Sequence, residues 1–340
     1  MKILLDAFGG DNSPGEIIKG AVDYVKEGGV AEVCLVGKED VIKQIIKENG
    51  YSDKNLSFLN ATEVITCEEA PTEAFKKKPD SSITVGMKVL KTGEYGAFVS
   101  AGSTGAVLTA GVLVAGRLKG VKRPGMGTIM PTVKGNPTFF MDCGANAECK
   151  PEFLVQFAII GDVYMKKVYG VKNPRIGLLC NGTEEEKGNA FTHSVYNALK
   201  QVEGINFIGN VEGRDIVSGT CDVVVTDGFS GNVAVKSIEG AAKVIMAVLK
   251  RNVMASLKAK IGFLFMKKAF KKTVKEIDYN NRGGAVFLGV NGVICKAHGS
   301  SKAPAIKASL FQAETAVKND IKSEIIARLT DEKLSLIKYE

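Results

Sequence analysis

Apolar segments of strand length alternate with helix-like segments along most of the chain, and this alternation constrains the fold more than any other feature. After the apolar segment 2–5, Ser13, Pro14 and Glu16 predict a helix start, because they supply an N-cap, a first-turn proline and a capping-box glutamate. Strands that alternate with helices predict an α/β fold of three layers, with helices on both faces of a mainly parallel sheet. The further strands are expected at 32–36, 97–100, 175–180 and 222–226, and the further helices at 39–48, 104–118, 190–200 and after 226.

Two segments depart from this alternation. Residues 127–130 and 138–141 form an antiparallel-looking pair around the loop 134–137, which predicts either a second sheet or an edge of the first. No repeat, low-complexity linker or clear boundary divides the 340 residues. We therefore expect a single α/β domain over 1–340.

A basic segment lies in the last third of the chain. Between residues 243 and 275 there are ten Lys or Arg residues and no Asp or Glu, so with a net charge of +8 the rest of the chain sums to about −2. Apolar residues recur through this segment at helical spacing, and an uninterrupted apolar run occupies 262–266. A basic amphipathic segment of this kind indicates a partner that is both anionic and hydrophobic.

The apolar run does not continue the stripe before it, because five consecutive apolar residues would cover every face of one helix. The pattern therefore predicts a protruding basic helical hairpin over 233–277, with one helix at 233–261, a tip at 262–266 and a returning helix at 267–277. Packing of the tip into the core is the alternative interpretation.

The chain lacks the sequence signals of exported and membrane-spanning proteins. Its start, MKILLDAFGGD, runs from a short strand into a polar turn, so we expect a cytoplasmic protein. The apolar stretch 105–116 is about half of the roughly 20 residues that a membrane span requires. Any membrane contact is therefore expected to be peripheral.

Cysteine and histidine usage argues against metal sites. The seven cysteines form no CxxC pair and only two histidines are present, so we expect reduced thiols and no metal. Cys143 and Cys180 adjoin Gly-rich turns, but neither has a histidine close in sequence, and buried cysteines are usually inert. A nucleophilic cysteine is the weaker interpretation.

Five Gly-rich polar turns follow expected strands, where open parallel sheets bind their ligands. They occupy 6–11, 100–106, 142–146, 181–190 and 226–232. The second turn directs free amides and hydroxyls toward the positive end of a helix dipole, which predicts an anion site, although helix capping with close glycine packing explains the same residues. Its candidate phosphate-binding residues are Ser100, Gly102, Ser103, Thr104 and Gly105.

Four side chains are candidates for the chemistry. Lys187 either lies in a solvated loop or supplies a cation for a phosphate or an oxyanion. Asn232 either caps the long helix or donates its amide to a reacting carbonyl, and Asp227 either forms a turn or accepts a proton. His298, beside glycine and serines, is either structural or a general acid or base. Two polar residues of neighbouring Gly-rich segments complete the candidate substrate site, Asn146 and Arg282.

Together, and in this order across nearly the whole chain, these motifs resemble those of the PlsX family, the acyl-acyl-carrier-protein:phosphate acyltransferases. DAFGGD resembles the family's DAMGGD with Phe8 in place of Met, and SAGSTGA resembles SAGNTGA with Ser103 in place of Asn. The change at Ser103 shortens a potential donor and leaves the backbone nest intact. The segments PTVKG, DCGAN, NGTEEEKGN, DVVVTDGFSGN and GGAVFLGVNGVICKAHGSS follow the family pattern as they stand.

The resemblance implies an α/β/α fold similar to isocitrate and isopropylmalate dehydrogenases and to phosphotransacetylase, without a cofactor. It implies reversible transfer of a long-chain acyl group from acyl carrier protein to inorganic phosphate, giving acyl phosphate for phospholipid synthesis. It makes Lys187 and Asn232 the strongest catalytic candidates, with the turn 100–105 holding phosphate, and Asp227, Arg282 and His298 as a second group.

The resemblance also implies a homodimer in which the hairpin arms of two subunits pair. The hairpin tip then contacts the anionic inner face of the cell membrane, where a membrane glycerol-3-phosphate acyltransferase consumes the product. The tip residues are Phe263, Leu264, Phe265 and Met266.

Two other functions stay open on the residues alone. A coenzyme A-dependent phosphotransacylase fits the same turns, although a basic surface favours acyl carrier protein, which is acidic. A basic module for lipid or nucleic acid is the other alternative. Nucleic acid is disfavoured as a partner because the positive charge is confined to one segment with an apolar end.

Overall fold

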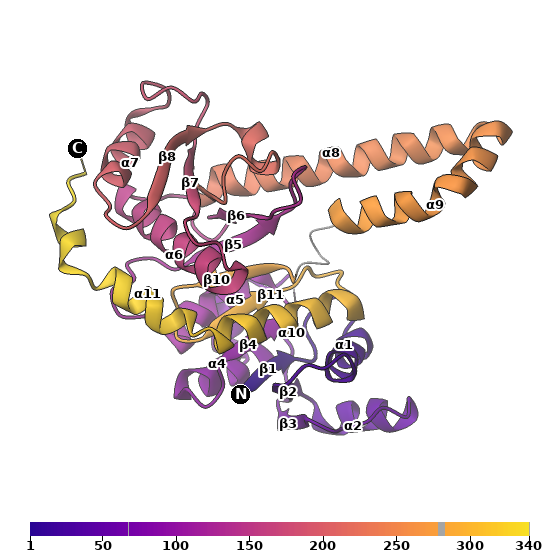
Figure 1. Cartoon of the computed structure of the whole chain (residues 1–340). Helices are drawn as coiled ribbons and strands as arrows, with labels where there is room; N and C mark the ends of the chain where they lie inside the picture. Colours follow the sequence, from indigo (N-terminus) through magenta and orange to yellow (C-terminus); the bar gives the residue numbers. More distant parts are fainter. Residues whose placement is uncertain (67, 278–282, 340) are drawn as a thin grey trace.

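The computed structural model describes residues 1–66, 68–277 and 283–339, and it places their strands in one eleven-stranded sheet (Figure 1). The expected α/β fold with a mostly parallel sheet is confirmed. The strand order is β3-β2-β1-β4-β11-β10-β5-β6-β9-β7-β8. In chain order the strands are β1 (Lys2–Asp6), β2 (Glu32–Gly37), β3 (Leu56–Asn60), β4 (Ala97–Ser100), β5 (Gly125–Met130), β6 (Thr138–Met141), β7 (Arg175–Leu179), β8 (Asn206–Val211), β9 (Val223–Val225), β10 (Ala285–Leu288) and β11 (Val293–Lys296).

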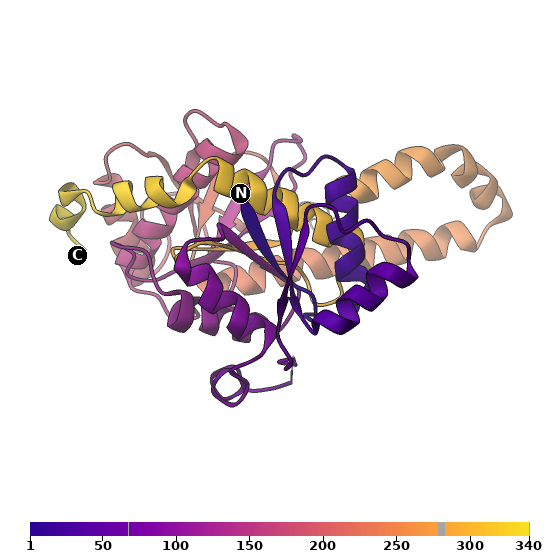
Figure 2. The same cartoon turned by 90° about the horizontal axis from the view of Figure 1, so that it is seen from below.

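Helices cover both faces of the sheet, as Figures 1 and 2 show. Successive strand residues point to opposite faces, so Ile3 and Leu5 pack into one core and Leu4 into the other. The first core is covered by α1 (Gly15–Lys26), α2 (Glu39–Glu48), α6 (Pro151–Tyr169), α7 (Ala190–Lys200), α10 (Ala303–Lys318) and α11 (Ile321–Leu329). The second is covered by α3 (Pro71–Lys77), α4 (Ser82–Thr92), α5 (Thr104–Ala110) with its π-helical extension 111–115, and the start of α8 (Gly228–Met254).

The antiparallel pair β5 and β6 lies in the middle of this sheet. The sequence predicted a second sheet or an edge, and both predictions are wrong, because β5 pairs with β10 and β6 pairs with β9. The local pattern revealed the pairing of the two strands but not their outer neighbours. The consequence is a reversal of direction: β6, β9, β7 and β8 run opposite to β1, β2, β3, β4 and β11.

The helical hairpin projects from the body of the molecule and consists of α8 and α9 (Leu257–Ile277) (Figure 1). The bend lies at 255–256 and not at the predicted tip 262–266, which belongs to the first half of α9. Gly262 lies inside this helix, where glycine lowers helix stability by about 1 kcal/mol relative to alanine. Phe263 packs edge-on against Phe270 of the same helix, with ring centroids 5.1 Å apart. Ser256, which accepts the Ala259 N–H at 3.3 Å, gives α9 its start.

Candidate active site

The turns that follow β1, β4 and β11 meet at one edge of the sheet. Asp6 is buried, and its carboxylate accepts the Ser100 hydroxyl at 2.6 Å. The Ser100 oxygen in turn accepts the Gly102 N–H at 2.9 Å. A Cβ atom on Gly9 would lie 2.6 Å from the Gly102 nitrogen, so only glycine allows this close approach. Ser100 and Gly102 therefore use these hydrogen bonds to stabilise the turn itself. Burial of Asp6 raises the pKa of its carboxyl group.

The start of α5 is the rest of the predicted phosphate turn. Ser103 is the N-cap and accepts the Ala106 N–H at 3.4 Å, which confirms the capping interpretation for this residue. Pro71 of α3 lies against Gly105, since a Cβ atom there would be 2.5 Å from the proline Cγ. Thr104 is the most exposed member of this turn.

The turn that follows β6 lies at the opposite edge of the sheet and packs against the start of α8. The buried Asp142 carboxylate accepts the backbone N–H groups of 144–146 at 2.9–3.0 Å and the Asn146 side-chain amide at 2.7 Å. The Gly228 N–H donates to the Asn146 carbonyl at 2.8 Å. A Cβ atom on Gly231 would lie 1.8 Å from the Asp142 carbonyl oxygen, so the first turn of α8 packs directly on this backbone.

Asn146 is used within the protein rather than presented to a substrate. Its amide nitrogen also donates to the Pro124 carbonyl at 2.8 Å, and its amide oxygen accepts the Arg123 Nε–H at 2.7 Å. The exposed guanidinium of Arg123 is thereby held beside the turn, a position that the sequence did not indicate. The candidate Arg282 lies outside the described residues.

Asp227, and not Asn232, caps α8. The Asp227 carboxylate accepts the Ser230 N–H at 2.9 Å, so the capping interpretation of Asn232 is wrong. Asn232 lies one turn further along the helix, exposed and beside Gly144, where a Cβ atom would be 3.4 Å from the Asn232 Cβ. Within 1–66, 68–277 and 283–339 its amide has no hydrogen-bond partner, so it is available to donate to a ligand.

Lys187 lies at the same edge as Asn232, because β7 and β9 are parallel neighbours and each is followed by one of the two turns. Its N–H donates to the Glu184 carbonyl at 3.1 Å, which fixes a tight turn. Its stem crosses Gly182, where a Cβ atom would lie 2.6 Å from the lysine Cγ. The exposed ammonium group forms no ion pair with any described residue, so a solvated cation and an amide donor occupy adjacent turns.

α8 connects the two edges. Asn232, Lys236, Glu239 and Lys243 follow one another at intervals of four, three and four residues and therefore share one helix face. Lys236 forms an ion pair with the mostly buried Glu239 at 2.9 Å. The basic segment predicted from the sequence begins at Lys243 and does not include this polar stripe, although the spacing of the four residues could have revealed it.

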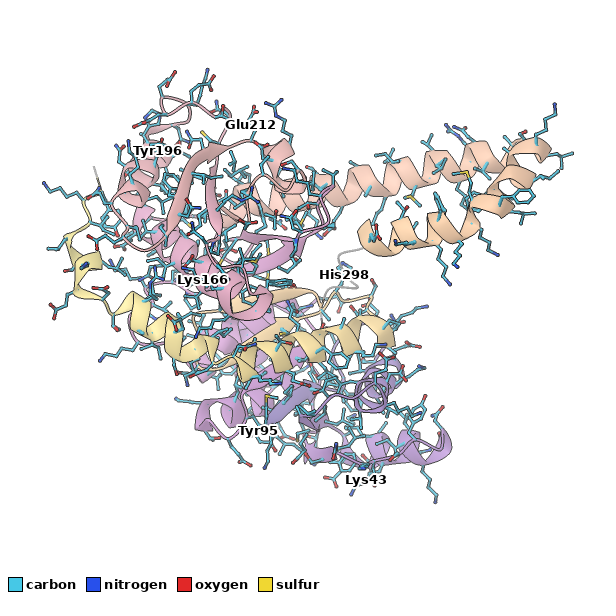
Figure 3. All side chains as sticks on the ribbon, viewed as in Figure 1. Lys43, Tyr95, Lys166, Tyr196, Glu212 and His298 are labelled. Atoms are coloured by element: carbon cyan, nitrogen blue, oxygen red, sulfur yellow. The ribbon has the colours of Figure 1, made fainter. Side chains whose placement is uncertain are left out.

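His298 faces the stripe from the turn after β11. It lies near the end of α9 (Figure 3). Its side chain lines the same cavity as Glu239 and Lys243. Burial lowers its pKa below the usual 6.5, and the positive charges of nearby lysines, Lys236 first, lower it further. The ring is therefore neutral at neutral pH. Its Nδ1 is within 2.9 Å of the Ser300 hydroxyl, which fixes its orientation.

The geometry argues against two other kinds of chemistry. Burial raises the pKa of the Cys143 thiol well above its usual range, which opposes a nucleophilic role. In the part of the chain that the structure describes, no group of three or more His, Cys, Asp or Glu side chains is placed to hold a metal ion.

Comparison with known proteins identifies the family. A family model described as a fatty acid synthesis protein matches residues 1–324. A phosphate acyltransferase of Dictyoglomus turgidum is 45% identical over 329 residues, which cover 97% of this chain and 98% of that relative. The chain belongs to this family. As the motifs indicated, it is a member of the PlsX family of phosphate acyltransferases.

Solved structures at lower identity share the fold of this PlsX-family chain. A phosphotransacetylase from Streptococcus pyogenes superposes with a TM-score of 0.62 at 16% identity, covering 94% of both chains. A 4-hydroxythreonine-4-phosphate dehydrogenase from Burkholderia phymatum superposes with a TM-score of 0.52 at 12% identity, covering 92% of this chain and 97% of that one. The expected likeness to phosphotransacetylase is confirmed, and a dehydrogenase also shares the fold.

Proposed function

We propose that this phosphate acyltransferase moves a long-chain fatty acyl group from the thioester of acyl carrier protein to inorganic phosphate. The observation that carries the proposal is that Asn232 and Lys187 follow adjacent parallel strands. Among the described residues, neither the Asn232 amide nor the Lys187 ammonium group has a hydrogen-bond or ion-pair partner. Such donors stabilise charge that develops on a carbonyl oxygen. The product, an acyl phosphate, is a precursor for phospholipid synthesis.

The chemistry requires positioning more than acid or base catalysis. A phosphate oxygen attacks the thioester carbonyl carbon, the carbon–oxygen bond forms, and the carbon–sulfur bond breaks. The thiolate leaves readily because the pKa of its thiol is about 8.5, and it takes its proton from solvent. Asn232 donates to the thioester oxygen, and Lys187 neutralises the charge on that oxygen or on phosphate. The attack is direct, without an acyl-enzyme.

Phosphate itself is assigned to the region where α8 passes His298. Lys236, one turn beyond Asn232 on α8, supplies positive charge there, and neutral His298 contributes a polar ring. Thr104, at the exposed start of α5, follows β4, which pairs in parallel with β11, so it approaches from the same edge as His298. Asp227 acts through its cap on α8 and not as a base.

The choice of donor tests this function. Acyl carrier protein is acidic, so the basic hairpin favours it over coenzyme A. We expect acyl phosphate to form faster from palmitoyl-acyl carrier protein than from palmitoyl-coenzyme A, and we expect the difference to narrow at high salt, because screening weakens the charge attraction. Acyl phosphate is measured directly. A faster reaction with coenzyme A at every salt concentration would assign the chain to the coenzyme A-dependent phosphotransacylases instead.

The hairpin is proposed to join two subunits and to dock on the anionic inner face of the cell membrane, next to a membrane glycerol-3-phosphate acyltransferase. Among the described residues, no helix has the length and apolarity needed to cross a bilayer. The proposal is supported by apolar side chains that α9 leaves exposed amid lysines, with Phe265 86% and Leu264 67% exposed. At such a surface the burial of apolar side chains in the bilayer and the attraction of lysines to anionic headgroups both stabilise membrane binding.

The membrane contact is tested with Leu264→Glu. This variant is expected to lose binding to anionic phospholipid vesicles in a sedimentation assay, because the new carboxylate is repelled by the headgroups and cannot be buried cheaply. Leu336→Glu is the matched control, since Leu336 is 76% exposed and lies in the C-terminal segment away from the hairpin. The dimer and the rate in solution should survive in both variants. Equal vesicle binding by the two would remove the tip from the membrane contact.

A further inference from the structure

A groove of about 1100 Å³ runs along α8 on the side of the polar stripe. Its walls come from α8, from the loop between β5 and β6, from the end of α9 and from the turn after β11. Apolar side chains dominate the lining, among them Met130, Val217, Val235, Ile238, Ala242 and Met246. None of these residues belongs to the catalytic or phosphate-binding candidates.

The dimensions of the groove fit a long, narrow ligand. Its α8 wall extends from Val235 to Met246, eleven residues that rise roughly 16 Å at 1.5 Å per residue. Val235 lies three residues after Asn232, so this end of the groove is about one helical turn from the residue that is proposed to hold the thioester oxygen. The groove then leads away from the reacting atoms toward the base of the hairpin.

The groove also carries charged and polar side chains. Glu239, Lys243 and His298 line the groove together with Glu276 of α9. A ligand with one polar, anionic end and one apolar chain matches this arrangement, because burial of methylene groups stabilises the complex while the polar end stays hydrated. An acetyl group would leave most of the groove empty.

A second copy of the chain fits a different surface. Val244, Ile245 and Val248 are exposed on α8 outside the groove, so the helix has one apolar face that lines the groove and another that is open to solvent. Pairing of two hairpins would use the open face. The groove shares His298 with the candidate active site, and this shared residue favours a substrate as its occupant.

We propose that the groove binds the acyl chain of the substrate and that Ala242 sets the longest chain accepted. This inference rests on the proposed acyl transfer. Ala242 lies seven residues beyond Val235, about 10 Å along the roughly 16 Å wall. A methyl group at this point lets a chain pass toward Met246, whereas a large side chain would end the groove there.

The test compares Ala242→Phe with Ala241→Phe. Ala241 is exposed on the neighbouring face of α8 and does not line the groove, so it is a control of the same size and helix. Rates of acyl phosphate formation are measured with octanoyl- and palmitoyl-acyl carrier protein. In Ala242→Phe the palmitoyl-to-octanoyl ratio is expected to fall at least tenfold, the size of effect that loss of a few methylene contacts produces. In Ala241→Phe the ratio should match the unaltered protein.

Direct binding separates this inference from the proposed function. A dansyl-labelled undecanoic acid is expected to bind the unaltered protein with enhanced fluorescence, and at least tenfold more weakly to Ala242→Phe. If no donor yields acyl phosphate but probe binding still depends on Ala242, the proposed function is wrong, while the assignment of the groove to an acyl chain is kept. Equal loss of both donor rates with unchanged probe binding would overturn the groove assignment. The assignment would also be wrong if Ala242→Phe changed the oligomeric state, measured by sedimentation, and left the preference for chain length unchanged.

Discussion

Asn232→Ala and Lys187→Ala are each expected to lower the rate of acyl phosphate formation at least a hundredfold while the protein stays folded. Among the described residues the Asn232 side chain forms no hydrogen bond and the Lys187 side chain forms no ion pair, so their removal costs the fold little. In the transition state each is expected to contribute one preorganised donor or charge, and loss of such a group costs about 3 kcal/mol. Rates at saturating substrate, with circular dichroism as the check on folding, measure the effect.

Two companion variants make this result specific. Asn232→Asp keeps the shape of the side chain but removes the amide donor and adds a negative charge, so its rate should fall at least as far as that of Asn232→Ala. Asn252→Ala removes an exposed amide from the distal part of the same helix and should leave the rate unchanged. A near-normal rate in folded Asn232→Ala would remove Asn232 from the mechanism, and the same outcome for Lys187→Ala would remove Lys187.

Local chemistry made the fold class and most elements predictable from the sequence. The structure has the expected strand at 2–5 and a helix that starts at Gly15. The predicted capping is wrong, because Pro14 occupies the N-cap position without a side-chain cap hydrogen bond. The Ser13 hydroxyl donates to the Phe8 and Gly10 carbonyls instead, and Glu16 accepts the distant Ala303 N–H at 2.8 Å. The bend of the hairpin was misplaced for a related reason. The apolar block at 262–266 is a strong signal, but Ser256 decides where α9 begins.

The arrangement of the Gly-rich turns could not be predicted in the same way. Turns after parallel strands meet at one edge only if every strand runs in the same direction. Three successive antiparallel pairings, of β11 with β10, of β10 with β5 and of β5 with β6, reverse half of the sheet. The pairing of β10 with β5 depends on contacts distant in sequence. The turns therefore divide between two edges, and α8 joins them. The stripe through Lys236 and Glu239 could be recognised from the spacing of the residues in the sequence. Its link to the candidate site became clear only in the structure, where His298 lies against the same helix face.

The largest effect on stability is expected from Asp142→Ala. The buried carboxylate accepts four N–H groups from 144–146, counting the Asn146 side chain, and a fifth from Met126 at 3.3 Å. Alanine leaves these donors without partners, and an unsatisfied buried donor costs about 1–3 kcal/mol. Because part of the turn reaches solvent and can be hydrated, we expect the free energy of unfolding to fall by about 3–5 kcal/mol. Urea unfolding measures this loss.

Asp227→Ala provides the comparison, because Asp227 is a half-buried carboxylate that accepts a single backbone N–H at the start of α8. Loss of one cap typically costs about 1 kcal/mol. Asp142→Asn should fall between the two, since one amide oxygen still accepts while the new NH₂ group opposes a backbone donor. If Asp142→Ala cost no more than Asp227→Ala, the turn at 142–146 would not depend on its carboxylate. The position of Asn232, which packs against this turn at Gly144, would then need another explanation.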